Sequence, residues 1–122
     1  MSRSITPIAR TKFQPYDLEG PVQPDMSWLP ISYRKETEVG SYFMRMQPGA
    51  RTIAHDHPGF EEFMVLEGEL IDSDGRRLRA GDFVSYEPGT HHNSWTESGC
   101  VIIVFEWGVE RSRSGGRATQ TS

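Results

Sequence analysis

The sequence lacks a second cysteine, a long apolar run and an excess of basic residues. Because Cys100 is its single cysteine, no disulfide can form within the chain, and a reducing cytoplasm is the expected location. The longest apolar run, VIIVF at residues 101–105, is far shorter than the roughly 18 residues of a membrane-spanning helix. Its 13 basic and 17 acidic residues give a net charge of −4. We therefore expect neither a membrane nor a nucleic-acid partner.

Helical periodicity is also missing. No window places apolar residues at i, i+3, i+4 and i+7 over the length of a helix. Instead, runs rich in β-branched and aromatic residues, such as FEEFMVL, DFVSY and VIIVFEW, alternate with turns that contain glycine. Asp74-Gly75 has the composition of a tight hairpin turn. The pattern predicts an all-β sandwich or barrel of short strands, with Cys100 buried beside the last of them.

Composition divides the chain into three segments. Residues 1–30 are expected to be an extended N-terminal arm outside the barrel, because their prolines exclude a long helix: Pro7, Pro15, Pro21, Pro24 and Pro30. Residues 31–109 carry the strand-and-turn pattern and form the single barrel domain. Residues 110–122 are basic, small and glycine-rich, and are expected to form a flexible tail.

All four histidines fall in two short stretches, HDHPGFEE at residues 55–62 and GTHHNSW at residues 89–95. Side chains alternate between the faces of a strand, so His55 and His57 point the same way. A Pro-Gly turn ends that strand, and Glu61 opens the next one. A third imidazole can come from the second stretch. Imidazoles and a carboxylate that converge inside an apolar barrel predict a metal site, which suits Zn, Fe(II), Mn, Ni or Cu.

Two spaced motifs resemble those of the cupin superfamily. GARTIAHDHPGFEEFMVLEG has the spacing of the first cupin motif at Gly49, His55, His57, Glu61 and Gly68. GDFVSYEPGTHH has the spacing of the second motif at Gly81, Gly89 and His92. The sequence departs from the family pattern at Glu87, where proline is usual, and at Thr96, where asparagine is frequent. Neither departure removes a ligand.

The resemblance is strongest to the cupin-like domain of ChrR-type zinc anti-sigma factors and to small dioxygenases that cleave acetylacetone or 2,4'-dihydroxyacetophenone. It implies an RmlC-like cupin β-barrel, a double-stranded β-helix of two antiparallel sheets, with one divalent metal per chain. Fe(II) or Zn is implied first, with Mn or Ni as alternatives. ChrR-type proteins carry a further N-terminal zinc-binding domain with His and Cys ligands, whereas residues 1–54 here contain neither residue type.

By position, the resemblance assigns the metal to His55, His57, Glu61 and His92. The adjacent Glu62 would face away from the metal by strand alternation, and motif spacing also favours Glu61. Motif spacing likewise favours His92 over its neighbour His91. We expect Glu62 and His91 at the rim of the site or beside its ligands, with simple exposure as the alternative for His91, and no catalytic side chain beyond the metal ligands.

Other residues can surround the metal and contact a substrate. Arg51 is in phase with His55 and His57, so it either meets an anionic substrate or is solvated at a strand start. Trp95 follows the second motif and can form a pocket wall. Residues with strand spacing are expected to line or pack the barrel: Phe63, Val65, Phe105 and Trp107. Strand 41–46 leaves open whether Tyr42, Met44 and Met46 or the opposite face points inward.

The resemblance implies a metal-dependent enzyme acting on a small molecule, first of all a non-haem Fe(II) dioxygenase that cleaves a diketone or hydroxyketone. Two alternatives stay open. One is a zinc-binding sensor or binding module of the ChrR type, and the other is a metal-dependent lyase or isomerase. Open sheet edges, a long N-terminal segment and the frequent pairing of cupins also predict a homodimer.

Overall fold

Strands make up nearly all the regular structure of residues 2–108, the part of the chain that the structure, a computed structural model, describes. Within this part, the one helical element is a 3-10 turn, η1 (Ile8–Arg10). The strands are β1 (Gln14–Tyr16), β2 (Gln23–Pro30), β3 (Gly40–Met46), β4 (His55–Asp56), β5 (Phe60–Asp72), β6 (Arg77–Arg79), β7 (Phe83–Tyr86), β8 (His91–His92), β9 (Ser94–Trp95) and β10 (Cys100–Trp107). The predicted all-β class is confirmed.

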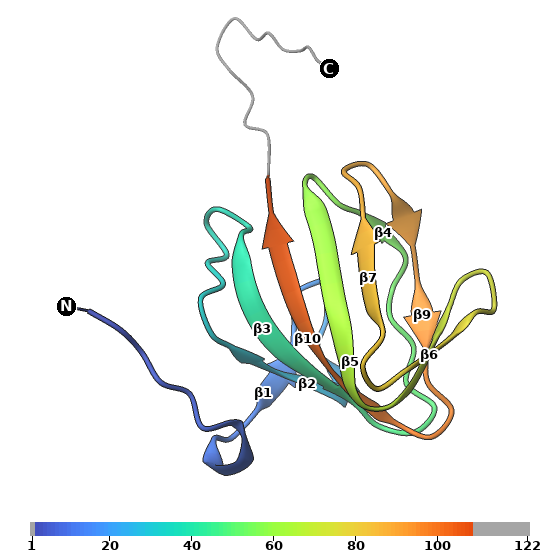
Figure 1. Ribbon diagram of the computed structural model, residues 1–122, viewed down its shortest axis with the longest axis horizontal. Helices are drawn as coiled ribbons and strands as arrows, with labels where there is room; N and C mark the ends of the chain where they lie inside the picture. The colour runs from blue at the N-terminus through green and yellow to red at the C-terminus, as the bar shows by residue number, and fades with distance from the viewer. Residues whose placement is uncertain (1, 109–122) are drawn as a thin grey trace, which may run out of the picture.

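The strands pair antiparallel throughout and curl into a cupin β-barrel. Eight of them form one sheet in the order β1-β2-β3-β10-β5-β6, with β7 and β9 also paired to β5, while β4 and β8 form a separate pair. Figure 1 shows β3, β10 and β5 side by side on one wall, with β4, β6 and β9 beyond β5. The barrel interior therefore lies between the long strands and the short ones.

Strand β5 belongs to both walls of the barrel. Its first half, Glu61–Met64, pairs with β7 and β10, and its end pairs with β6 and β9. Between the halves lies Gly68, with φ of 77°. A Cβ at this position would collide with the carbonyl oxygen of Gly99. The first motif thus needs glycine here because two backbones approach closely at positive φ.

The core is built from the inward faces of β3, β5 and β10. Strand β3 turns Tyr42, Met44 and Met46 inward, which settles the alternative that the sequence left open. Cys100 is 5% exposed, as predicted, and burial raises the pKa of its thiol to about 11. The hairpin predicted at Asp74-Gly75 also forms, between β5 and β6.

The N-terminal segment differs from the arm that its prolines predict. Strands β1 and β2 extend the sheet beside β3, and they bury Tyr16, Met26 and Trp28 in the same core. The Trp28 ring packs edge-on against Tyr42 with centroids 5.4 Å apart. Proline excludes a helix but permits an extended strand, and the alternation of Met26 and Trp28 gives β2 one apolar face. The tail predicted for residues 110–122 lies outside the described residues.

The outer face of the same sheet carries a continuous apolar row. Cross-strand partners, one from each of β2, β3, β10, β5 and β7, form it: Leu29, Phe43, Ile103, Met64 and Phe83. Phe83 at the end of the row is 55% exposed. These side chains point away from the barrel interior, because their neighbours in each strand point into it.

Candidate metal centre

Three buried side chains converge at one end of the barrel interior. Glu61 is the second residue of β5, His57 follows β4, and His92 lies in β8. They are 5–8% exposed. Nε2 of His57 and Nε2 of His92 are 3.2 Å apart, and Oε1 of Glu61 lies 3.0 Å from His92 Nε2 and 3.3 Å from His57 Nε2. The three residues could hold a metal ion.

These separations suit ligands of one ion. Nitrogen and oxygen ligands lie about 2.0–2.2 Å from zinc or a similar divalent ion, so two of them at tetrahedral or right angles are roughly 2.8–3.6 Å apart. The separations between the three ligand atoms, 3.0, 3.2 and 3.3 Å, fall in this range. Two imidazoles and one carboxylate also form a donor set that divalent transition metals prefer. The residues present therefore fit such an ion.

Backbone pairing brings the two histidine stretches together. In the β4–β8 pair, His55 lies opposite His92 and Asp56 lies opposite His91. The amide of Gly89 donates to the carbonyl oxygen of His57 at 2.9 Å, which joins the two Pro-Gly turns. The spacing of both motifs thus positions backbones that are far apart in the sequence.

The fourth predicted ligand, His55, is described only in its backbone. Its strand position is the one that faces His92, and its side chain lies outside the described structure. Its role as a ligand therefore stays a prediction.

Tyr86 holds the His92 ring, and sequence analysis missed this contact. The two rings stack with centroids 3.8 Å apart and planes 16° apart. The Tyr86 hydroxyl donates to Asp72 at 2.6 Å. Burial, with this hydrogen bond, raises the pKa of Tyr86 well above its usual range, so the phenol stays protonated. The alternation of residues within DFVSY could have indicated this contact, because it places Tyr86 on the same inward face as Val84.

Glu62 and His91, the sequence neighbours of Glu61 and His92, point away from the candidate metal centre. Glu62 accepts hydrogen bonds from Ser85 Oγ at 2.8 Å and from Trp107 Nε1 at 2.9 Å. His91 is exposed, and its Nδ1 lies 2.7 Å from Asp56 Oδ1. Strand alternation therefore separates each of these residues from its buried neighbour.

A cavity of about 30 Å³, roughly the volume of one water molecule, adjoins Glu61 and His92. Its apolar walls are Met44, Phe63, Leu70, Ile102 and Val104, and its polar walls include Tyr16, Glu19, Tyr42, Thr52 and Ser94. Phe63, which was expected to line or pack the barrel, is one of these walls. Tyr16 and Glu19 were missed, because they reach the cavity only through the long-range pairing of β1 and β2.

The other predicted pocket residues do not line this cavity. Alternation along β10 places Phe105 and Trp107 on the outer face, where Trp107 stacks on Phe60 with centroids 4.2 Å apart. Arg51 is exposed and packs its guanidinium over the ring of Trp95, 4.8 Å from the centroid. Val65 is buried in the core. Arg51 is the one basic residue among the predicted pocket residues. It does not line the cavity, because its guanidinium packs against Trp95.

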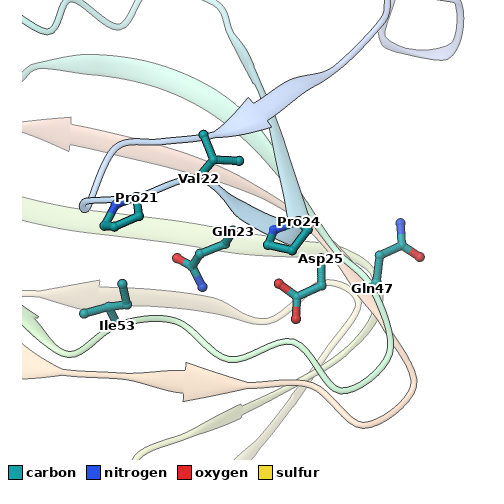
Figure 2. Close-up of a pocket in the computed structure, with 7 residues that line it drawn as sticks. All are labelled: Pro21, Val22, Gln23, Pro24, Asp25, Gln47 and Ile53. Atoms are coloured by element: carbon teal, nitrogen blue, oxygen red, sulfur yellow. The ribbon is translucent and has the colours of Figure 1, made fainter.

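A second hollow, of about 600 Å³, lies on the surface between the start of β2 and the segment before β4. Figure 2 shows its walls, which are aliphatic or amide side chains apart from Asp25. Gln23 donates from Nε2 to the carbonyl oxygen of Arg51 at 3.0 Å and so ties the two walls together. Its seven lining residues include no imidazole or thiol, so we place the chemistry at the buried triad.

Comparison with known proteins agrees with this architecture. Residues 11–110 match the sequence model of the family described as ChrR Cupin-like domain. The chain belongs to the ChrR cupin-like family. No curated protein matches the sequence. Within residues 2–108, this ChrR cupin-like chain has no helix long and apolar enough to cross a membrane.

Solved structures similar to the ChrR cupin-like chain share its fold at low identity. An RmlC-like cupin from Shewanella frigidimarina is 20% identical, with a TM-score of 0.68 over 86% of this chain and 91% of its own. An acetylacetone dioxygenase from Acinetobacter johnsonii is 14% identical, with a TM-score of 0.71 over 98% of this chain and 85% of its own. The Rhodobacter sphaeroides complex of SigE with the anti-sigma ChrR gives 17% identity and a TM-score of 0.64, over 81% of this chain and 50% of the matched chain.

Proposed function

We propose that this protein is a metal-dependent enzyme, a non-haem Fe(II) dioxygenase that cleaves a small diketone or hydroxyketone. The observation that carries the proposal is the buried triad of His57, Glu61 and His92, whose ligand atoms lie 3.0–3.3 Å apart. We include His55 as the fourth ligand. Likeness of fold to an acetylacetone dioxygenase supports the choice of substrate class.

The protein's part in this chemistry is binding, orientation and exclusion of water. His57, Glu61 and His92 would hold the ion, and a bound divalent ion would polarise a ketone oxygen and, as Fe(II), react with O₂. Tyr86 fixes the His92 ring by stacking, and Asp72 fixes Tyr86. Phe63, with the other apolar walls of the cavity, keeps bulk water from the reacting atoms.

Metal analysis and oxygen uptake test this proposal together. Protein purified without added metal should contain about one iron per chain, and a β-diketone from a panel should cause O₂ consumption in an oxygen electrode. Each metal ligand is needed both for the iron content and for the O₂ consumption. Stoichiometric zinc without O₂ uptake over the whole panel would refute the dioxygenase.

A zinc-binding sensor or binding module is the second candidate function. The family match to the ChrR cupin-like domain favours it, and two imidazoles with one carboxylate suit zinc as well as iron. In that case the same ligands would bind zinc, and a small molecule would bind without turnover. Calorimetric binding of a ligand that produces no product distinguishes this candidate from the enzyme.

We also propose that the protein forms a homodimer through the outer face of its large sheet. The apolar row ends at Phe83, and a two-fold contact requires such a face to match itself. A two-fold axis that lies between the two sheets, parallel to the row, would set the row of one copy against the row of the other.

Sedimentation tests the dimer. The 13.9 kDa chain should sediment as a species of twice that mass at micromolar concentration, and Phe83→Glu should shift it to the monomer. Ile53→Glu is the matched control, because Ile53 is a similarly exposed apolar residue, 43% against 55%, that lies at the other hollow. A wild-type monomer, or equal effects of the two variants, would contradict the proposed interface.

A further inference from the structure

The surface hollow of Figure 2 and the cavity beside the triad adjoin the same short segment, residues 51–53, which we call the strap. Thr52 lines the cavity together with two of the metal ligands, and the next residue, Ile53, lines the hollow. Figure 2 shows Ile53 on one side of the hollow and Pro21 and Val22 on the other. The strap therefore lies between a space that is open to solvent and the candidate metal centre.

The two spaces differ in the ligand that each can hold. The cavity, at about 30 Å³, has room for about one water molecule. The hollow, at about 600 Å³, has the size of sites that bind small organic molecules, which is about 300–1,000 Å³. A small ketone therefore fits the hollow as it stands, and it can reach the metal ligands from there when the strap moves aside.

The lining of the hollow suits a small uncharged molecule with carbonyl oxygens. Two amide side chains, those of Gln23 and Gln47, can donate hydrogen bonds to such oxygens. The charged member of the lining is Asp25, which would repel an anion. Aliphatic side chains offer surface to the carbon skeleton of the ligand: Pro21, Val22, Pro24 and Ile53.

The strap is attached differently on its two sides. Toward β9, the amide of Thr52 donates to the carbonyl oxygen of Ser94 at 2.8 Å, the amide of Ser94 donates to Thr52 Oγ1 at 2.8 Å, and Arg51 packs on Trp95. Toward β2, Gln23 Nε2 donates to the carbonyl oxygen of Arg51 at 3.0 Å. Backbone bonds thus anchor the strap to β9, whereas a side-chain amide, which a change of rotamer can release, holds it against β2.

We infer that the hollow is an entry site for a small uncharged ketone, and that Gln23 holds closed the strap which the ketone passes on its way to the metal. The inference rests on the proposed function and adds to it a second binding site and a route. Gln23 is a positioning residue that acts on the strap and takes no part in binding the metal. Because its hydrogen bond closes the strap with and without a ligand behind it, it sets the rates of entry and exit together and leaves the affinity unchanged.

Stopped-flow mixing of the cobalt-loaded protein with acetohydroxamic acid, a small uncharged chelator with a ketone-like pair of oxygens, measures entry. Gln23→Ala should raise the association and dissociation rates about fivefold each and leave the dissociation constant unchanged, because a hydrogen bond of this kind shifts an equilibrium by a factor of roughly 2 to 12. Gln47→Ala is the matched control, because Gln47 lines the same hollow and, within residues 2–108, its side chain is not bonded to the strap. Ile53→Trp, which fills part of the hollow, should slow association about fivefold.

Alkylation of Ser94→Cys in the metal-free protein tests the same route without cobalt. Ser94 lines the cavity and is 6% exposed, so a thiol at this position should react with iodoacetamide when the strap opens. Adding Gln23→Ala should speed this reaction about fivefold, and adding Gln47→Ala should leave it unchanged. Cys100, whose thiol is buried and has a raised pKa, is the internal reference for an unreactive thiol.

Cobalt content, measured on each protein, separates the possible failures. A wild-type protein that binds no cobalt overturns the proposed function and, with it, the entry site. A loaded protein that binds no acetohydroxamic acid, or in which Gln23→Ala and Gln47→Ala give the same rates of binding or of alkylation, overturns the entry site alone. If thermal unfolding shows that Gln23→Ala is poorly folded, Gln23→Met, which keeps the length of the side chain and loses the donor, gives the same comparison with the same expected result.

Discussion

Neighbouring residues on opposite faces of one strand have entirely different surroundings in this protein. Glu61 and His92 are buried together, whereas Glu62 and His91 bond to outer-face or exposed partners. The His92 side chain is 9% exposed and that of His91 is 62% exposed. A shift of one residue thus moves a group from the proposed metal centre to the solvent side, and strand register alone determines which group can bind the ion.

Removing a ligand should have the largest effect on this contrast. We expect His92→Ala and Glu61→Gln to weaken metal binding by about a thousandfold, because a site worth roughly 10–16 kcal/mol loses one of four ligands. His91→Ala and Glu62→Gln should leave metal content unchanged. Elemental analysis after dialysis against a weak chelator measures both.

The same elemental analysis tests the register of the second motif. It also tests the role of His55, whose side chain lies outside the described structure. His55→Ala should behave as His92→Ala does. If His91→Ala empties the site and His92→Ala does not, the second motif is displaced by one residue.

Truncating a methionine should lower the stability of the fold much more on the inner face of the sheet than on the outer face. Met46 is 1% exposed on the inner face of β3, and Met64 is partly exposed on the outer face of β5. Met46→Ala should lower the free energy of unfolding by about 3 kcal/mol, as buried methionine truncations do, and Met64→Ala by less than about 1 kcal/mol. Urea titration in the background of the Phe83→Glu monomer measures both values, and similar losses would contradict the contrast between the two faces.

High pH should act on the inner face more than on the rest of the molecule. Burial raises the pKa of Tyr42 well above its usual range. Its phenol therefore loses its proton in the unfolded chain near pH 10 and keeps it in the folded protein, so this stabilisation is present below about pH 10 and is lost as pH rises further. The loss approaches ~1.4 kcal/mol per pH unit for a fully buried phenol.

Comparing urea titrations at pH 8 and pH 11 isolates this contribution. Tyr42→Phe should lose less stability between the two pH values than the wild type, whatever its stability at pH 8. Tyr33→Phe, at a less buried phenol, should give a smaller difference. Identical pH dependence in Tyr42→Phe and the wild type would contradict the assignment.

The smallest effect is expected on the outer face. Glu62 accepts two hydrogen bonds there from partly exposed partners, Ser85 and Trp107. Such bonds contribute little, so Glu62→Gln should lower the free energy of unfolding by less than about 1 kcal/mol. Thermal unfolding measures this change, and a loss as large as that of Met46→Ala would break the contrast between the faces.

The strand and turn pattern predicted the fold class, and motif spacing predicted which of two adjacent residues points inward at Glu61 and His92. Both depend on a period of two along one strand, which is local information. The structure brings three of the four predicted ligands together, and the His55 side chain remains to be tested. Local pattern was sufficient here because each ligand lies within a few residues of a Pro-Gly turn, Pro58-Gly59 or Pro88-Gly89.

Other features depend on pairing between distant segments, which a single sequence does not reveal. Phe105 and Trp107 share one face of β10, as their spacing predicts. Which face of β10 points inward, however, depends on its pairing with β3 and β5, and the pairing with β5 has a bulge between Val101 and Ile102. Tyr16 and Glu19 reach the cavity because β1 and β2 join the sheet. Proline content correctly predicted extended structure there, but it carries no information on which strand receives that segment.

The place of β10 in the sheet also governs the order in which the molecule can be assembled. It is the last strand of the described chain, and it pairs between β3 and β5, whose partner residues precede it by 32 to 66 positions. During synthesis, the edges of β3 and β5 that pair with β10 stay open until β10 has been made. Pairings of such long sequence separation are slow and leave intermediates prone to association. The barrel should therefore complete its folding only after β10 has left the ribosome.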